Sequence, residues 1–196
     1  KQEDMVLAEV CPEATAQLRR RFPRATILPH DITSPEGRAA IAAYKGMVDI
    51  VIVAIPCQPS STASNVHDPS DIRIAIGQDA VEQGCALNPR VIVVENVASF
   101  TWKQPEAYTA AFAAVESASD CVAVFKLDAS ACMVPMQRNR MLLVGTKGID
   151  LGITERMIAA QKLAASGKEL RTWPSVREAL GKYRSMRQVD GIFMPD

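Results

Sequence analysis

The sequence predicts one α/β domain in which a mostly parallel sheet is flanked by helices. Three observations support this fold class. Short apolar, β-branched segments alternate along the chain with segments of helical composition. The segment DIVIVAI, Asp49–Ile55, has almost no polar alternation, which is typical of a strand buried on both faces of a parallel sheet. The length of 196 residues is enough for one domain with its own core.

The expected strands and helices follow one another in regular order. The strands share short runs of apolar residues and are Met5–Val10, Thr26–Leu28, Asp49–Ile55, Val91–Val94, Val122–Phe125 and Met141–Val144. The helices share good helix formers, several after a proline or a capping residue, and are Glu13–Arg21, Ser34–Tyr44, Asp71–Gln83, Gln104–Ala118 and Ile153–Ala165. The polar segment Pro56–Pro69 predicts a loop at the end of the third strand.

Composition narrows the class of protein. Lys+Arg and Asp+Glu number 22 each, so the net charge is zero and any nucleic acid must be bound by a local patch. The five cysteines form no Cys-x-x-Cys pair, which argues against a disulfide framework and a structural zinc site. No apolar run approaches the roughly 20 residues that span a bilayer, and no secretory leader opens the chain. We therefore expect a cytoplasmic protein without a metal or a membrane partner.

Chemically useful side chains stand at the predicted strand ends. In open parallel sheets, ligands bind beyond the carboxyl ends of the strands. The residues at or beside these ends are, in chain order, Glu9, Asp31, Cys57, Glu95, Arg138 and Arg140. Cys57 and Glu95 are separated by enough chain for a loop, one crossover helix and a parallel return strand. A thiol, a carboxyl group and two guanidinium groups at one edge suggest a nucleophile, a proton donor and a charge clamp.

These residues form a pattern that is similar to a known family. Pro56-Cys57-Gln58, Glu95-Asn96-Val97 and Gln137-Arg138-Asn139-Arg140 resemble the three central motifs of the cytosine-5 DNA methyltransferases, in the same order and at plausible spacing. The resemblance extends from about Met5 to the end of the chain. It implies the Rossmann-like fold of S-adenosylmethionine-dependent methyltransferases, here in an incomplete form.

The resemblance implies a role for each motif residue. Cys57 would attack C6 of a cytosine as the thiolate, and Glu95 would hold the N3 edge and supply a proton there. Arg138 and Arg140 would orient the base and the reacting groups. The methyl group of S-adenosylmethionine would pass to C5. The target base would have to be flipped out of the duplex, at a cost of a few kcal/mol.

The resemblance also implies which residues bind the cofactor and the substrate. The cofactor residues would be Glu9, on the ribose hydroxyls, Asp31 and Ile32, beside the adenine, and also Val10 and Pro56. The substrate-binding residues would be Gln58, Ser61, Arg73 and Asn96.

The chain departs from the family pattern in three places. The opening Phe-x-Gly-x-Gly loop, which should precede the Glu9 strand, is absent, so this chain alone should bind S-adenosylmethionine poorly. The loop Ser61–Asp68 contains no glycine, although Asp71 and Arg73 match the Asp-x-Arg that commonly ends it. Residues 1–170 are therefore expected to be the catalytic domain without its first cofactor loop, and the basic residues 171–196 the start of the connection to an absent target-recognition domain.

Each assignment has a plainer structural alternative. Cys57 could be a small core residue, and Glu95 could cap the following helix. Arg138 and Arg140 could form a solvated basic turn, whereas Glu9 rests on one short match and Asp31 could be a turn residue. The joint presence of three motifs at strand ends favours the chemical interpretation.

The sequence thus predicts methylation of cytosine C5 in double-stranded DNA, in a bacterial or phage restriction-modification setting. One alternative is the same chemistry on transfer RNA. A second is a catalytically silent subunit that binds nucleic acid or a partner. A nicotinamide-dependent enzyme is disfavoured because no Gly-x-Gly-x-x-Gly follows any predicted strand.

Overall fold

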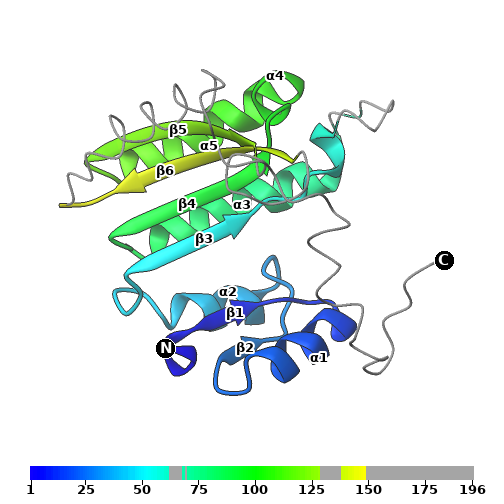
Figure 1. The fold of residues 1–196 in the computed structure, drawn as a ribbon, viewed down its shortest axis with the longest axis vertical. Helices are drawn as coiled ribbons and strands as arrows, with labels where there is room; N and C mark the ends of the chain where they lie inside the picture. The colour runs from blue at the N-terminus through cyan, green and yellow to red at the C-terminus, as the bar shows by residue number, and fades with distance from the viewer. Residues whose placement is uncertain (62–67, 69, 129–137, 149–196) are drawn as a thin grey trace, which may run out of the picture.

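A computed structural model describes residues 1–61, 68, 70–128 and 138–148 of the chain. A two-stranded sheet and a four-stranded sheet lie beside each other along the long axis of the molecule (Figure 1). Helices α3 and α5 pack on one face of the four-stranded sheet, and α1 and α2 pack against the two-stranded sheet. The expected α/β fold class is confirmed.

The strands and helices lie where the sequence places them, although β1 is shorter and β5 and β6 are longer than expected. The strands are β1 (Val6–Ala8), β2 (Thr26–Leu28), β3 (Ile50–Ala54), β4 (Val91–Val97), β5 (Cys121–Asp128) and β6 (Asn139–Thr146). The helices are α1 (Pro12–Arg21), α2 (Pro35–Ala42), α3 (Ile72–Ala86), α4 (Phe100–Lys103) and α5 (Pro105–Ser117), with short 3-10 turns at Gln2–Asp4 and Gln58–Ser60. The expected helix Ile153–Ala165 and the segment 171–196 lie outside the described residues.

The helix starts follow from local chemistry. Pro12 and Pro35 occupy the beginning of α1 and α2, where the missing N–H of proline costs nothing. The Ser34 hydroxyl accepts a hydrogen bond of 3.0 Å from the Gly37 amide, and the Asp71 carboxylate accepts one of 3.0 Å from the Arg73 amide. These caps satisfy amides that the helices leave without partners, so each start is determined by its own short sequence.

The four-stranded sheet has the order β3-β4-β6-β5 and is mixed. β3 and β4 are parallel, as expected, and so are β1 and β2 in the small sheet. β6 runs antiparallel to both β4 and β5, which corrects the expectation of parallel strands in this half. The chain between Asp128 and Asn139 is shorter than the dozen or so residues that a parallel crossover needs, so an antiparallel return is the accessible topology.

The antiparallel pairing also lengthens β4 beyond the expected end at Val94. Its register with β6 runs to Val97, opposite Arg140. Glu95 and Asn96 are therefore strand residues. The sequence had suggested that they follow the strand. Because side chains alternate across a sheet, the two residues point to opposite faces.

The main core lies between the four-stranded sheet and helices α3 and α5. Its buried residues come from both layers: Val53, Ile55, Val81, Ile92, Val94, Phe100, Ala111, Val115, Met141 and Leu143. Each large member contributes about 1.5–3 kcal/mol by leaving water. Gly77 lets α3 approach the end of β3 closely, since a Cβ there would lie 2.3 Å from Ile55 Cγ2. This close contact holds the strand end from which the Cys57 loop departs.

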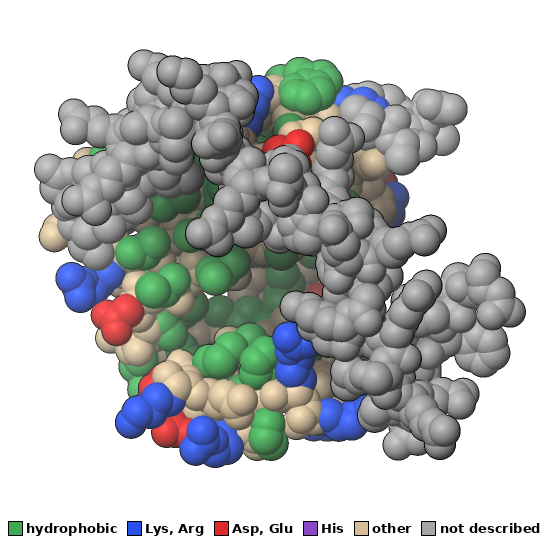
Figure 2. Space-filling view, in the orientation of Figure 1, with side chains coloured by type: hydrophobic (Ala, Val, Ile, Leu, Met, Phe, Trp, Pro, Cys, Tyr) green, Lys and Arg blue, Asp and Glu red, His purple; other side chains and the backbone are tan. Residues whose placement is uncertain are grey.

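The two sheets are not joined by strand pairing between β1 and β3, although these strands run in the same direction (Figure 1). A cavity of about 670 Å³ lies between them, lined by apolar residues of both strands. Ile50 and Ile52 of β3 are 62% and 72% exposed beside it. Figure 2 shows hydrophobic side chains around this hollow. The small sheet is thus attached to the large one by other contacts.

Candidate active site

Cys57 lies at the end of β3, where the chain leaves the sheet. It is a free cysteine of intermediate burial, so its thiol is neither sealed in the core nor fully exposed. It opens the short turn Gln58–Ser60, in which the Ser60 amide donates to the Cys57 carbonyl oxygen at 3.0 Å. The alternative of a buried core cysteine does not apply to this position. In contrast, Cys85 sits on α3, and burial raises the pKa of its thiol.

Strand pairing brings Glu95 to the same edge as Cys57. Ala54 pairs with Glu95, and the Ile55 amide donates to the Glu95 carbonyl oxygen at 3.2 Å. Cys57 follows two residues later. The side chain of Glu95 is 30% exposed, so it remains open to a ligand at this edge. Glu95 lies in a strand, which removes the alternative that it merely caps a helix.

Arg140 completes a charged pair with Glu95. Its Nε lies 2.6 Å from Glu95 Oε1, and its side chain is only 20% exposed. The pair crosses from β6 to β4, two strands that are adjacent in the sheet. Arg138 lies one residue before β6 and is exposed, and its backbone amide donates to an Asp128 carboxylate oxygen at 3.2 Å. The structure therefore places Arg140 directly against the acid and Arg138 at the same strand end.

The end of the small sheet carries the two other acids predicted from the sequence. The Glu9 amide donates to the Leu28 carbonyl oxygen at 3.1 Å, and Glu9 Oε1 accepts a hydrogen bond of 2.8 Å from the Cys11 amide. Asp31 Oδ1 accepts hydrogen bonds from the amide and the hydroxyl of Thr33, both at 2.8 Å. These bonds, the amide first, lower the pKa of Asp31. Hydrogen bonds thus hold both acids at the same end of the small sheet.

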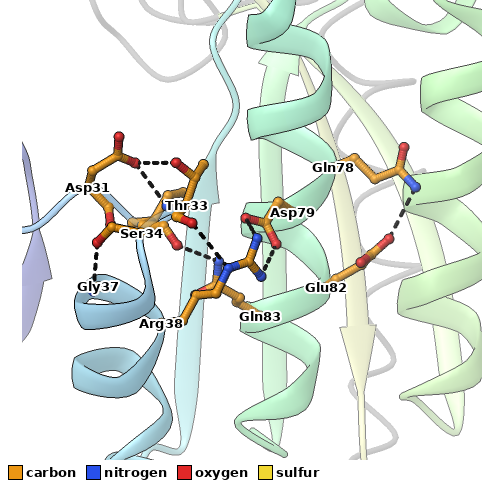
Figure 3. A network of polar contacts seen from close by, with 10 residues as sticks. Asp31, Thr33, Ser34, Gly37, Arg38, Gln78, Asp79, Glu82 and Gln83 are labelled. Carbon is orange, nitrogen blue, oxygen red and sulfur yellow. Dashed lines mark hydrogen bonds and ion pairs between the residues drawn. The ribbon is translucent and has the colours of Figure 1, made fainter.

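Figure 3 shows how the Asp31 loop is bonded to helix α3, directly and through Arg38 of α2. Arg38 of α2 forms a bidentate pair with Asp79 of α3, with both N–O distances 2.7 Å, and its Nε donates to the Thr33 carbonyl oxygen at 3.3 Å. Gln83 of α3 donates to the Ile32 carbonyl oxygen at 2.9 Å. A cavity of about 540 Å³ lies beside this network and is lined by Asp31 among others. Side-chain contacts, not strand pairing, therefore hold Asp31 and Ile32.

Most other residues predicted for the site are accessible. Val10 is 58% exposed just beyond β1. Pro56 and Ser61 are of intermediate burial on either side of the Cys57 turn, and Gln58 within the turn is exposed. These positions leave each of the four open to a ligand.

Arg73 and Asn96 have structural partners. Arg73 forms an ion pair of 2.5 Å with Asp71, which lowers the pKa of that carboxyl group to about 2. Asn96 is fully buried, and its Oδ1 accepts a hydrogen bond of 2.7 Å from the Val97 amide. Within the described residues, its buried Nδ2 has no hydrogen-bond partner. Its side chain lies on the core side of β4, and the predicted contact of Asn96 with a substrate stays a prediction.

Sequence reasoning missed three polar residues next to the site: Ser99, Lys103 and Gln104. They lie in and around α4, a helix of one turn that the sequence did not reveal. Each donates a side-chain hydrogen bond to the loop after Cys57. No motif marks them, because their contacts cross about forty residues of chain.

Neither a metal-binding cluster nor a membrane-spanning helix is present in the described part of the chain. In those residues, no cluster of three or more His, Cys, Asp or Glu side chains could hold a metal ion. Nor is any helix there long and apolar enough to cross a bilayer.

A family model for C-5 cytosine-specific DNA methylases matches residues 3–186, almost the whole chain. The chain belongs to this family. The expected family membership is confirmed. A search of curated proteins finds no match to the chain.

Solved structures of methyltransferases have a similar fold. A protein assigned as a DNA modification methyltransferase of an E. coli prophage matches with a TM-score of 0.67 and 18% identity, over 91% of this methylase chain and 49% of its own. S. pombe Dnmt2 matches with a TM-score of 0.54 and 14% identity, over 76% of this chain and 45% of its own. A mutant of Spodoptera frugiperda DNMT2 matches with a TM-score of 0.53 and 19% identity, over 75% of this chain and 43% of its own. The chain thus spans about half the length of the proteins it matches, and the methyltransferase fold is confirmed.

Proposed function

We propose that this chain carries the reacting half of an enzyme that methylates C5 of cytosine in DNA through a covalent adduct between Cys57 and C6 of a flipped-out base. One observation carries the proposal. The pairing of β3 with β4 brings an accessible thiol and an acid held by Arg140 to the same edge of one sheet. Family membership supplies the reaction class.

Cys57 is the proposed nucleophile. Cytosine C5 is a poor nucleophile by itself, and a thiolate that bonds to C6 moves electron density to C5, which splits one difficult step into two easier ones. After the methyl group has been added at C5, loss of the C5 proton and release of the Cys57 thiolate restore the ring. The thiol needs access to a base for this role, and its intermediate burial at a strand end provides that access.

Glu95 and the arginines are proposed to hold the base during attack. Glu95 would grip the N3 edge and supply a proton there, so that negative charge does not build up on the ring. Arg140, at 2.6 Å, fixes the orientation of the Glu95 carboxyl group. Arg138, exposed beside it, is free of the strand and is proposed to orient the base or its phosphate.

The residues at the end of the small sheet fit S-adenosylmethionine. That molecule offers ribose hydroxyls and an adenine amino group, which are hydrogen-bond donors that carboxylates accept. In Glu9 and Asp31 the hydrogen bonds described above occupy one carboxylate oxygen each and leave the second. Ile32, Val10 and Pro56 are proposed to line the same site. When bound, the cofactor supplies the methyl group.

The remaining predictions stay proposals. Gln58, Ser61 and Arg73 are proposed to contact the base or the DNA backbone around it. The division into a catalytic domain 1–170 and a connecting segment 171–196 remains a prediction, as do the restriction-modification setting and the bacterial or phage cytoplasm. That this chain alone binds S-adenosylmethionine poorly also stays a prediction.

Covalent trapping tests the function. A duplex containing 5-fluorocytosine stops the reaction after methyl transfer, because fluorine cannot leave as the C5 proton does. We expect the natural full-length protein, with cofactor, to form a stable adduct that Cys57→Ala abolishes. Cys121→Ser is the matched control, since Cys121 is also a free cysteine but begins β5 at the sheet edge away from β3.

The trap also separates the alternatives. A fluorocytosine-substituted transfer RNA that formed the adduct in place of DNA would support the RNA alternative. A protein that bound nucleic acid but formed an adduct with neither would be the silent subunit, and the proposed chemistry would be rejected.

A further inference from the structure

Three consecutive carbonyl groups after Cys57 accept hydrogen bonds from side chains of one short segment. Gln104 Nε2 donates to the Pro59 oxygen at 3.3 Å, the Ser99 hydroxyl donates to the Ser60 oxygen, and Lys103 Nζ donates to the Ser61 oxygen at 2.8 Å. The donors stand in and around α4, which follows β4 directly. β4 is the strand that carries Glu95. The loop of the thiol is therefore bonded to the continuation of the strand of the acid.

Burial makes the bonds from Ser99 and Gln104 difficult to replace by water, whereas the bond from Lys103 is partly buried. Ser60 is 2% exposed, Ser99 is 4% exposed and Gln104 is 7% exposed. The carbonyl groups stand in and just after the 3-10 turn Gln58–Ser60, where backbone acceptors run out of partners within the turn. A buried carbonyl group that loses its donor pays the desolvation cost without compensation. The Ser99 and Gln104 side chains thus satisfy two carbonyl groups of the turn in buried surroundings, and Lys103 adds a third, partly buried bond.

The donors are themselves held by backbone contacts. The Ser99 carbonyl oxygen accepts from the amides of Trp102 and Lys103, and the Gln104 amide donates to the Phe100 carbonyl oxygen at 3.1 Å. Phe100 is 4% exposed, and its ring meets that of Tyr108 edge-on at a centroid distance of 6.0 Å. The donor segment is consequently a rigid support for the loop.

We propose that Ser99, Lys103 and Gln104 are positioning residues that hold the Cys57 loop against the Glu95 strand; this rests on the proposed function. Pairing between β3 and β4 ends with the bond from the Ile55 amide to the Glu95 carbonyl oxygen. Cys57 lies two residues beyond that bond, and the three bonded carbonyl groups follow it. The two sets of bonds bracket the nucleophile, so that its distance from the acid is set on both sides.

The reaction provides the first test. In the natural full-length protein, we expect Ser99→Ala to slow formation of the fluorocytosine adduct about tenfold, the effect of losing one buried hydrogen bond. The KM for DNA should stay unchanged, because the bond acts on the thiol's position. Lys103→Met should slow the reaction less, and Lys103→Arg should restore it. Thr101→Val is the matched control, since its hydroxyl donates to the Ala98 carbonyl oxygen of its own segment and not to the loop.

Hydrogen exchange provides a test that needs neither cofactor nor DNA. The Ser60 amide donates to the Cys57 carbonyl oxygen, so its exchange rate reports on the turn itself. Ser99→Ala should raise exchange of the amides between Cys57 and Ser61 about tenfold and leave β4 unchanged. Thr101→Val should change neither.

The two measurements separate the failures. Unchanged exchange in Ser99→Ala would overturn the proposal that the Ser99 side chain holds the Cys57 loop. Faster exchange with an unchanged adduct rate would show that the bond from Ser99 stabilises the loop only, and it would overturn the positioning role. If the wild-type protein formed no adduct, the proposed function would be rejected. The exchange rates would still decide whether the Ser99 side chain holds the loop.

Discussion

The predicted site residues at the ends of the two sheets are held in place in different ways. At the proposed reaction edge, formed by Cys57, Glu95 and Arg140, pairing between neighbouring strands of one sheet sets the positions. At the proposed cofactor edge, formed by Glu9, Asp31 and Ile32, the strands are three residues long. There the Asp31 loop depends on side-chain bonds from α2 and α3.

The difference suggests how the work of the site is divided. Strand pairing ties the reaction edge to the main core, so we expect it to keep its geometry without a ligand. The cofactor edge rests on more exposed contacts, such as Arg38, whose side chain is 51% exposed. We therefore expect substitutions at the two edges to have separable effects on chemistry and on cofactor binding.

The largest effect is expected from the acid at the reaction edge. Glu95→Gln should slow adduct formation by about 10²–10⁴-fold, the range typical of losing a positioned proton donor. Cofactor affinity, measured by calorimetry, should stay unchanged. Glu106→Gln, at an exposed acid in the first turn of α5, is the control. An adduct rate close to that of the wild type would remove Glu95 from the chemistry.

The next effect concerns the packing of the Asp31 loop on α2. A Cβ at Gly37 would lie 1.9 Å from the Asp31 carbonyl oxygen, and backbone cannot move as a flexible side chain can. Gly37→Ala should cost about 1–3 kcal/mol in the free energy of unfolding. Cofactor affinity should fall at least tenfold, because the loop is displaced. Glu36→Ala on the same turn is the control, and an equal loss in both variants would contradict the steric explanation.

A smaller effect is expected from the pair that joins α2 to α3. Asp79→Asn should lower the free energy of unfolding by at most about 1 kcal/mol, since Arg38 is half exposed and water screens the pair. The combined exchange Arg38→Asp with Asp79→Arg should recover part of this loss in urea unfolding. If the double variant were no better than Asp79→Asn, the ion pair would not be what links the two helices.

The smallest effect concerns ionisation at the cofactor edge. The Thr33 amide and hydroxyl lower the pKa of Asp31, so Thr33→Val, which keeps the amide, should raise that pKa part of the way back. A carboxyl group with a lowered pKa stabilises the fold above its ordinary pKa and loses this contribution as the pH falls through the folded value. Titration of the Asp31 carboxyl carbon by NMR measures the change. An unchanged pKa would mean that the amide bond alone accounts for the shift.

Several elements could be predicted from the sequence because their signals are local. The run Asp49–Ile55 contains β3, and Pro12, Pro35 and Asp71 begin or cap their helices at the expected places. Cys57 could be singled out because it follows a proline at the end of a buried strand. Such signals depend on neighbours in the chain, and no tertiary contact is needed to interpret them.

Other features could not be predicted because they depend on contacts between distant segments. The true end of β4 follows from its pairing with β6, which turns Asn96 into the core while Glu95 stays at the edge. The antiparallel pairing itself depends on a connection too short for a crossover. α4 is a single turn whose polar residues matter only because the Cys57 loop lies against them.

By itself, the sequence determined the α/β alternation and the helix starts, because periodicity, capping and loop chemistry act over a few residues. Only the tertiary structure decided that Arg140 pairs with Glu95, that Asn96 is buried and that Ser99, Lys103 and Gln104 form hydrogen bonds with the loop after Cys57. Those contacts join strands and turns far apart in the chain, and their geometry exists only once the sheet has formed and its core has packed.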